Sequence, residues 1–278
     1  MAADAFFRCD GDQYVPTELT RGPWGPDYQH AGPPAGLIGR EFERLDGGDG
    51  RHVARVTFEV LRPVPIAPLR VQAGVVRPGR SVELVEATLS DADGDVIKAR
   101  AWRLRTEAVE LPAGLSSADG PGLIGSSPST LRPGFAPPGP AEASPGTFPK
   151  TGSDVGYHTA MDYRFLQGDF GEAGPALVWM RMRHPLIAGE EPTPLQRVLV
   201  AADSGNGVSA TLDWTRYLFI NVELTVHLHR ALAGEWVCMD AITIPEPDGV
   251  GLADTALYDE RGPIGRAMQA LLIDERGE

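Results

Sequence analysis

Apolar side chains recur at helical spacing in two stretches of the chain, which predicts two amphipathic helices. The first covers about residues 34–45, where Leu37, Ile38 and Phe42 share one face. The second covers about residues 195–202, directly after a proline, whose missing backbone N–H does no harm at a helix start. Gly205 and Gly207 follow the second helix and are expected to weaken or end it.

Other stretches alternate apolar and polar residues, as half-buried β-strands do. Strands are expected at 13–19, 56–60, 69–75, 85–89, 96–105, 157–165, 177–183, 218–228, 235–244, 251–258 and 264–273. Turns at residues 91–94 and 259–262 would join neighbouring strands into hairpins. A helix followed by consecutive antiparallel strands is typical of an α+β fold.

The two halves of the chain repeat each other. Val60-Leu-Arg62 matches Leu228-His-Arg230, Gly94 matches Gly262, and both matches are 168 residues apart. The repeat predicts an internal duplication, with residues 1–107 and 155–278 as two like units paired about a pseudo-twofold axis. Residues 108–154 are rich in proline, glycine and serine, and they are predicted to form a linker.

The composition of the chain argues against several classes of protein. The chain has 278 residues and a net charge of −13, and it lacks the basic stripe that binds nucleic acid. Cys9 and Cys238 stand in dissimilar contexts, which favours neither a disulfide framework nor a metal site. No basic, apolar leader and no membrane-length apolar run is present, so a soluble, cytoplasmic protein is expected, without contact to a membrane.

Asp203 is the first candidate for chemistry. It lies four residues after Leu199, which places its carboxylate at the tail of the apolar face of the second helix. A buried carboxylate costs several kcal/mol unless it is paired or hydrogen-bonded, so its position needs an explanation. Two explanations are open: Asp203 hydrogen-bonds the turn that follows the helix, or it takes part in a reaction.

Segments of both halves resemble the double hot-dog acyl-CoA thioesterases, which are related to the type II bacterial enzymes. They are His30-Ala-Gly-Pro-Pro-Ala-Gly, Phe58-Glu-Val-Leu-Arg-Pro-Val-Pro, Ala201-Ala-Asp-Ser-Gly-Asn-Gly, Val226-His-Leu-His-Arg and Arg266-Ala-Met-Gln-Ala-Leu-Leu. The resemblance covers both halves but not the linker. It implies two tandem hot-dog units, each a long helix wrapped by a curved antiparallel sheet, with the sheets edge to edge and an acyl thioester between the units. It also implies pairing of two chains into a homodimer.

The resemblance also implies functional residues. The catalytic Asp and Gln of the family fall on Asp203 and Gln269, and the family's hydroxyl residue falls on Asn221, which departs from the pattern. Candidate substrate-binding residues lie in glycine-rich segments and at matching strand ends; they are His30, Gly32, Gly36, Gly205, Arg62 and Arg230. An arginine fork suits the phosphates of CoA, although solvated strand-end charges are the alternative for the two arginines. No cofactor and no metal are implied.

These side chains suit hydrolysis of a thioester. An Asp can take a proton from water, while Gln and Asn amides fix the orientation of that water. A pair of backbone N–H groups would stabilise the oxyanion, from the glycine-rich loop at residues 24–36 or from the turn at residues 205–207.

The repeat gives an independent argument for a functional Asp203. In the first half, Asn221 corresponds to Val53 and Gln269 to Ala101, while matching the two helices places Asp203 opposite Phe42. A structural role should tend to appear in both copies, whereas a catalytic role needs only one. The differences therefore favour one working site per chain.

Alternatives remain. His227 and His229 share a strand face, but no third metal ligand is evident, which favours a surface pair. Ser204 with His158 or His184 invites a Ser-His-Asp interpretation, yet the sequence has no G-x-S-x-G motif. Two further functions on the same fold stay open: a non-catalytic acyl-CoA-binding protein and an enoyl-thioester hydratase. Hot-dog hydratases use an Asp/His pair near the helix, and no histidine closely follows Asp203.

Overall fold

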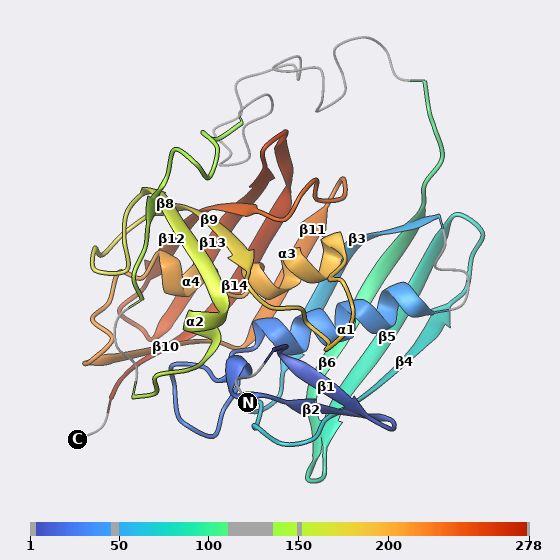
Figure 1. Ribbon diagram of the computed structural model, residues 1–278, viewed down its shortest axis with the longest axis horizontal. Helices are drawn as coiled ribbons and strands as arrows, with labels where there is room; N and C mark the ends of the chain where they lie inside the picture. The colour runs from blue at the N-terminus through green and yellow to red at the C-terminus, as the bar shows by residue number, and fades with distance from the viewer. Residues whose placement is uncertain (1–3, 46–49, 111–135, 149–151, 277–278) are drawn as a thin grey trace.

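The computed structural model describes residues 4–45, 50–110, 136–148 and 152–276 (Figure 1). The first unit contains β1 (Phe7–Asp10), β2 (Gln13–Pro16), a short 3-10 turn (Glu18–Thr20), α1 (Gly32–Arg44), β3 (Arg51–Val60), β4 (Arg70–Arg77), β5 (Val82–Asp91) and β6 (Gly94–Arg105). The remaining elements are β7 (Ser144–Pro145), α2 (Tyr157–Ala160), β8 (Met161–Gln167), β9 (Ala176–Met182), α3 (Pro194–Ala202), α4 (Gly205–Val208), β10 (Tyr217–Asn221), β11 (Glu223–Leu228), β12 (Val237–Pro245), β13 (Val250–Asp259) and β14 (Gly262–Glu275).

One antiparallel sheet of twelve strands runs through both units and lies behind α1 and α3 in Figure 1. Its order is β4-β5-β6-β3-β11-β14-β13-β12-β9-β8-β7, with β10 also paired to β14. The two halves meet where β3 pairs with β11, for example at Phe58 opposite Leu224. This is the predicted α+β architecture of two tandem units, each a helix against an antiparallel sheet, joined edge to edge.

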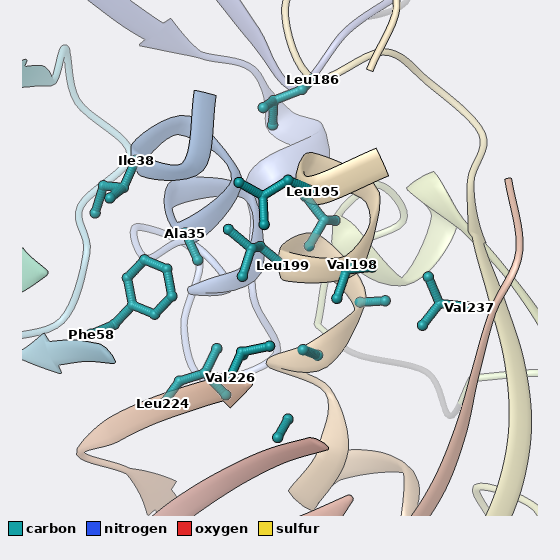
Figure 2. Packing of buried hydrophobic residues seen from close by; sticks show 14 of the residues in the cluster. Ala35, Ile38, Phe58, Leu186, Leu195, Val198, Leu199, Leu224, Val226 and Val237 are labelled. Atoms are coloured by element: carbon teal, nitrogen blue, oxygen red, sulfur yellow. The ribbon is translucent and has the colours of Figure 1, made fainter. Parts of the chain in front are cut away.

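The helices α1 and α3 pack directly against each other in the middle of the molecule. Small residues on one face of α1 permit the close approach: a Cβ on Gly32 would lie 2.4 Å from the backbone oxygen of Val200, and one on Gly39 would lie 2.5 Å from a methyl of Leu199. Figure 2 shows Leu195 and Leu199 of α3 beside α1, with the apolar side chains of β11 lining the same core. The predicted apolar residues of α1, Leu37, Ile38 and Phe42, are fully buried, but α1 meets α3 through its glycines. The predicted apolar residues Leu195 and Leu199 of α3 pack against this glycine face.

An ion pair repeats in both units and confirms the duplication. The guanidinium of Arg62 donates to the Asp91 carboxylate and the Gly94 carbonyl. At the matching positions, Arg230 donates to the Asp259 carboxylate and the Gly262 carbonyl. Each pair braces a hairpin turn against the end of a preceding strand.

The structure departs from the predicted elements in a few places. The strand expected over 218–228 is two strands, interrupted at Val222, and the strand expected from 157 begins only after the short helix α2. The second helix ends at Ala202, and the predicted glycines lie in a separate short helix, α4. Strand β1 carries a mostly exposed pattern that no alternation revealed.

Part of the expected linker lies outside the described residues, and part lies against the second unit. Within residues 136–148, the carbonyl of Pro138 accepts from the indole N–H of Trp179, and β7 pairs with β8. The domain boundaries stay predictions. No helix in the described portion of the chain is long and apolar enough to cross a membrane.

Candidate active site

Asp203 occupies the C-terminal cap of α3, and its side chain is only 4% exposed. Three segments outside the helix supply its partners. The amide of Asn221 donates to Oδ1 at 2.9 Å, Nε2 of Gln269 lies 3.5 Å from the same oxygen, and Nδ1 of His30 lies 3.0 Å from Oδ2. None of these partners belongs to the turn after the helix, so the turn-bonding explanation does not describe this carboxylate.

Gln269 holds the backbone around Asp203. It lies on β14 and is 1% exposed; its Nε2 donates to the carbonyl of Asp203 at 3.1 Å, and its Oε1 accepts from the N–H of Asn206 at 3.1 Å. The missing side chain of Gly205 allows α4 to pack closely against the sheet, since a Cβ at this position would lie 2.6 Å from the hydroxyl of Thr255. The amide of Gln269 thus joins α3, α4 and β14 at the point where the catalytic carboxylate was expected.

Asn221 reaches Asp203 from the interruption between β10 and β11. At this break the backbone N–H of Val222 donates to the carbonyl of Ala270, and the N–H of Ala270 donates to the Glu223 carboxylate. The side chain of Glu223 therefore takes the place of a backbone partner. The irregularity aims the Asn221 amide at Asp203 and explains why alternation alone predicted a single strand.

His30 comes from the first unit, just before α1. Its ring stacks on Tyr157 with centroids 3.8 Å apart and planes 9° apart. The hydroxyl of Tyr157 donates to the carbonyl of Val200 at 2.7 Å and lies 2.9 Å from the hydroxyl of Ser204. Burial strongly raises the pKa of Tyr157, so its hydroxyl stays neutral and holds the ring that supports His30.

A cavity of about 370 Å³ opens beside these groups and is lined by both units. Asp203, Asn221 and His30 are in its wall, whereas Gln269 is not. Aromatic side chains form much of the remaining wall: Trp24, Tyr28, Phe148, Tyr157, Tyr163, Phe170 and Trp214. Trp24 stacks on Trp214 at 5.4 Å, and Phe148 meets Phe170 edge to face at 4.6 Å. Three polar side chains thus converge on one side of an apolar chamber of the size that small ligands occupy.

The other predicted substrate-binding residues have different surroundings. Gly32, Gly36 and Gly205 are not in the cavity wall; at Gly36 a Cβ would lie 2.8 Å from a methyl of Val200, so it too serves helix packing. Arg62 lines the cavity, but its guanidinium is held by the hairpin turn, and Arg230 is not in the wall.

The alternative sites gain no support from the geometry. Within residues 4–45, 50–110, 136–148 and 152–276, no group of three or more His, Cys, Asp and Glu side chains could hold a metal ion. Ser204 has Tyr157 as its side-chain partner, and burial lowers the pKa of His158, which also lines the cavity.

Two parts of the site were missed by sequence reasoning. His30 was expected to bind substrate, but its contact with Asp203 joins residues 173 positions apart, and no local pattern reveals it. The support from Tyr157 was missed because an isolated tyrosine is typical of a core. The proximity of α1 and α3 was the available signal, since packed antiparallel helices bring the start of one to the end of the other.

Two family models match the chain. A model of the acyl-CoA thioesterase N-terminal domain matches residues 20–104, and one of the acyl-CoA thioesterase C-terminal domain matches residues 137–273. No functionally curated protein matches the sequence.

Solved structures share the fold over nearly the whole chain. A putative thioesterase II from Thermobifida fusca is 17% identical, with a TM-score of 0.70 over 96% of this chain and 94% of that one. A hot-dog protein of unknown function from Alicyclobacillus acidocaldarius is 14% identical, with a TM-score of 0.69 over 99% and 97%. An acyl-CoA thioesterase II from Mycobacterium marinum is 15% identical, with a TM-score of 0.62 over 97% and 94%. The predicted double hot-dog fold is confirmed.

Proposed function

The chain belongs to the acyl-CoA thioesterase family, and on this premise we propose that it hydrolyses acyl-CoA in the cavity between its two units, with a water activated at Asp203. One observation carries the proposal: a buried carboxylate is held by side chains from three other segments at the wall of an apolar cavity. Membership of the family confirms the predicted enzyme class.

The reaction needs a water beside the thioester carbonyl carbon. In the proposed mechanism, the acid–base site at Asp203 accepts a proton from that water while the water oxygen adds to the carbonyl carbon. The negative charge of Asp203 stabilises the transferred proton. The C–S bond then breaks, the acid is released, and the CoA thiolate takes up the proton that the water lost. Asn221 holds the carboxylate through a direct hydrogen bond. Gln269 positions Asp203 through the backbone, because its amide is hydrogen-bonded to the carbonyl of Asp203 and the N–H of Asn206.

The apolar wall is the proposed acyl-binding surface. The rings of Trp24, Trp214 and Phe148 supply apolar area without losing much side-chain entropy. Each of the two segments predicted to supply backbone donors for the oxyanion contributes a residue to the cavity wall, namely Ala31 and Gly207. Both segments therefore stay candidates for this role.

A hydrolysis screen tests the proposal. Acyl-CoA substrates from acetyl to palmitoyl are incubated with the protein while free thiol is measured, and turnover with at least one chain length is expected. Binding measured by calorimetry without release of thiol would contradict hydrolysis and favour the non-catalytic acyl-CoA-binding alternative.

One specific observation favours the alternative function, hydration of an enoyl thioester. The sequence has no histidine close after Asp203, yet the fold brings His30 within 3.0 Å of its carboxylate. Such a pair suits addition of water to a C=C bond as well as to a carbonyl. Incubation with a 2-enoyl-CoA separates the two: loss of the conjugated absorbance without free thiol would indicate hydration.

Pairing of two chains is part of the proposal. The cross-strand pair Val250–Leu272 is exposed on the outer face of the second unit, and Val82–Leu104 is exposed at the matching positions of the first. Contiguous exposed apolar side chains favour an interface. Light scattering should give twice the chain mass, and Leu272→Glu should reduce it. A monomeric wild-type protein would contradict the homodimer. The cytoplasmic location expected from the sequence stays a prediction.

A further inference from the structure

We infer that His30, contributed by the first unit, is the immediate acceptor of the proton from the attacking water, and that Asp203 acts through it. The inference rests on the proposed hydrolysis and deepens it. It turns a residue expected only to bind substrate into a catalytic residue, and it makes the reaction depend on both units of the chain.

The first argument is the hydrogen bonding of Asp203. Its carboxylate already has Asn221 and Gln269 beside Oδ1 and His30 beside Oδ2, and the side chain is 4% exposed. Both carboxylate oxygens are thus already engaged by side chains, which leaves the attacking water little access to them. Such a group is better suited to hold a partner and balance a positive charge than to take a proton from water directly.

The second argument is the proton on His30. Nδ1 lies 3.0 Å from Oδ2 of Asp203 and 3.1 Å from the backbone nitrogen of Gly32. A single ring nitrogen cannot donate to the carboxylate and accept from the N–H of Gly32 at once. The hydrogen bond to a carboxylate is the stronger, so we assign the proton to Nδ1 and the lone pair to Nε2.

The third argument is the position of the ring. Its face is fixed against Tyr157, its Nδ1 edge is fixed on Asp203, and the residue lines the cavity while being 14% exposed in its side chain. No described residue hydrogen-bonds to Nε2. The basic nitrogen is therefore available to a water in the cavity, on a ring whose orientation is set from two sides.

The step balances without any further reactant. Nε2 takes a proton from water as the water oxygen forms a bond to the thioester carbonyl carbon. The resulting imidazolium is stabilised by the adjacent Asp203 carboxylate. When the tetrahedral intermediate collapses and the C–S bond breaks, Nε2–H returns the proton to the CoA sulfur, and histidine is neutral again.

Conservative variants separate a base from a mere support. In His30→Asn the amide nitrogen can replace Nδ1 as donor to Asp203, but no basic nitrogen replaces Nε2. If His30 is the base, kcat for the best acyl-CoA falls by about 10²–10⁴-fold with little change in KM. His30→Ala should lose as much, and added imidazole should restore at least about 10-fold of the lost kcat. Imidazole should not restore Asp203→Asn.

Thr193→Ala is the matched control. Thr193 lies directly before α3, and His30 lies two residues before α1. The hydroxyl of Thr193 donates to Glu43 near the end of α1 at 2.7 Å. This substitution removes a side chain at the corresponding helix junction, so kcat should stay within about twofold of wild type while the protein loses about 1 kcal/mol of stability. Thermal melts accompany every variant.

The outcomes are distinct. A His30→Asn protein that melts like wild type and keeps kcat within about 10-fold would overturn the assignment of His30 and leave hydrolysis standing. A large loss in His30→Ala that imidazole does not restore would also overturn it. If wild-type protein releases no thiol from any acyl-CoA, the proposed function fails and the role of His30 fails with it.

Discussion

The helices α1 and α3 form two junctions, at each of which the end of one helix lies beside the start of the other. The two junctions differ in the chemistry of their side chains. The end of α3 meets the start of α1 through Asp203 and His30, and the end of α1 meets the start of α3 through Glu43 and Thr193. Each junction adjoins a cavity, of about 370 Å³ at Asp203 and about 300 Å³ at Glu43. The molecule thus has two comparable places in which an acid near the end of one helix approaches a residue just before the other helix.

Only the junction at Asp203 collects the groups that the proposed hydrolysis needs. The positions that match Asn221, Gln269 and Asp203 are Val53, Ala101 and Phe42, all buried and apolar. The partner of Glu43 is a hydroxyl, which cannot serve as a base near neutral pH, whereas the partner of Asp203 is an imidazole. In the cavity at Glu43, Arg103 is tied to Glu83 and to the carbonyl of Phe42. The junction at Glu43 therefore lacks the groups that the proposed hydrolysis needs, and the junction at Asp203 holds them.

The largest effect is expected at the junction of Asp203 and His30. Asp203→Asn keeps the shape but removes the charge that balances a protonated His30, so kcat should fall by about 10²–10⁴-fold with KM little changed. Steady-state kinetics on the best acyl-CoA measures this. A variant with wild-type turnover would contradict the proposed role of Asp203.

A smaller loss is expected when the support behind Asp203 is removed. Gln269→Ala deletes the hydrogen bonds to the carbonyl of Asp203 and to the N–H of Asn206, but the charge and His30 remain. We expect about a 10-fold lower kcat and a lower melting temperature. A loss as large as that of Asp203→Asn would mean that Gln269 contacts the reacting water itself.

The repeated ion pairs should affect stability and leave kinetics unchanged. Burial alone would raise the pKa of Asp259, but hydrogen bonds from Arg230 and two backbone N–H groups hold it below its ordinary value; Arg62 does the same for Asp91. A lowered carboxyl pKa stabilises the fold above the ordinary pKa and loses that contribution as pH falls through the folded value. Asp259→Asn and Asp91→Asn should each cost about 1–3 kcal/mol at pH 7 and approach wild type below about pH 4. Unfolding by urea across pH measures this, and kcat should not change.

The smallest effect is expected at Glu43. Burial raises the pKa of this carboxyl despite hydrogen bonds from Thr193 and Gln196. The ionised form therefore costs stability as pH rises through the folded pKa, whereas below the ordinary pKa the cost is absent. Glu43→Gln should raise the melting temperature by a few degrees at most near pH 8, match wild type at low pH, and keep full activity. Loss of activity in this variant would break the distinction between the two junctions.

Sequence reasoning reached the scaffold more fully than the site. The 168-residue repeat predicted the paired turns, and helical spacing predicted the buried faces of α1 and α3, because both patterns are local or strictly periodic. Asp203 stood out as a carboxylate on an apolar face. Its contact with His30 did not, since it depends on how α1 and α3 cross. The aim of Asn221 depends on a strand interruption that alternation does not encode.

The central claim is that one cavity, assembled from both units, holds the thioester. A crystal structure with a non-hydrolysable acyl-CoA thioether tests it most directly. We predict one ligand per chain, with its acyl group against the rings of Trp24, Trp214 and Phe148 and the thioether beside His30 and Asp203. A ligand in the cavity at Glu43, or one in each cavity, would contradict the account.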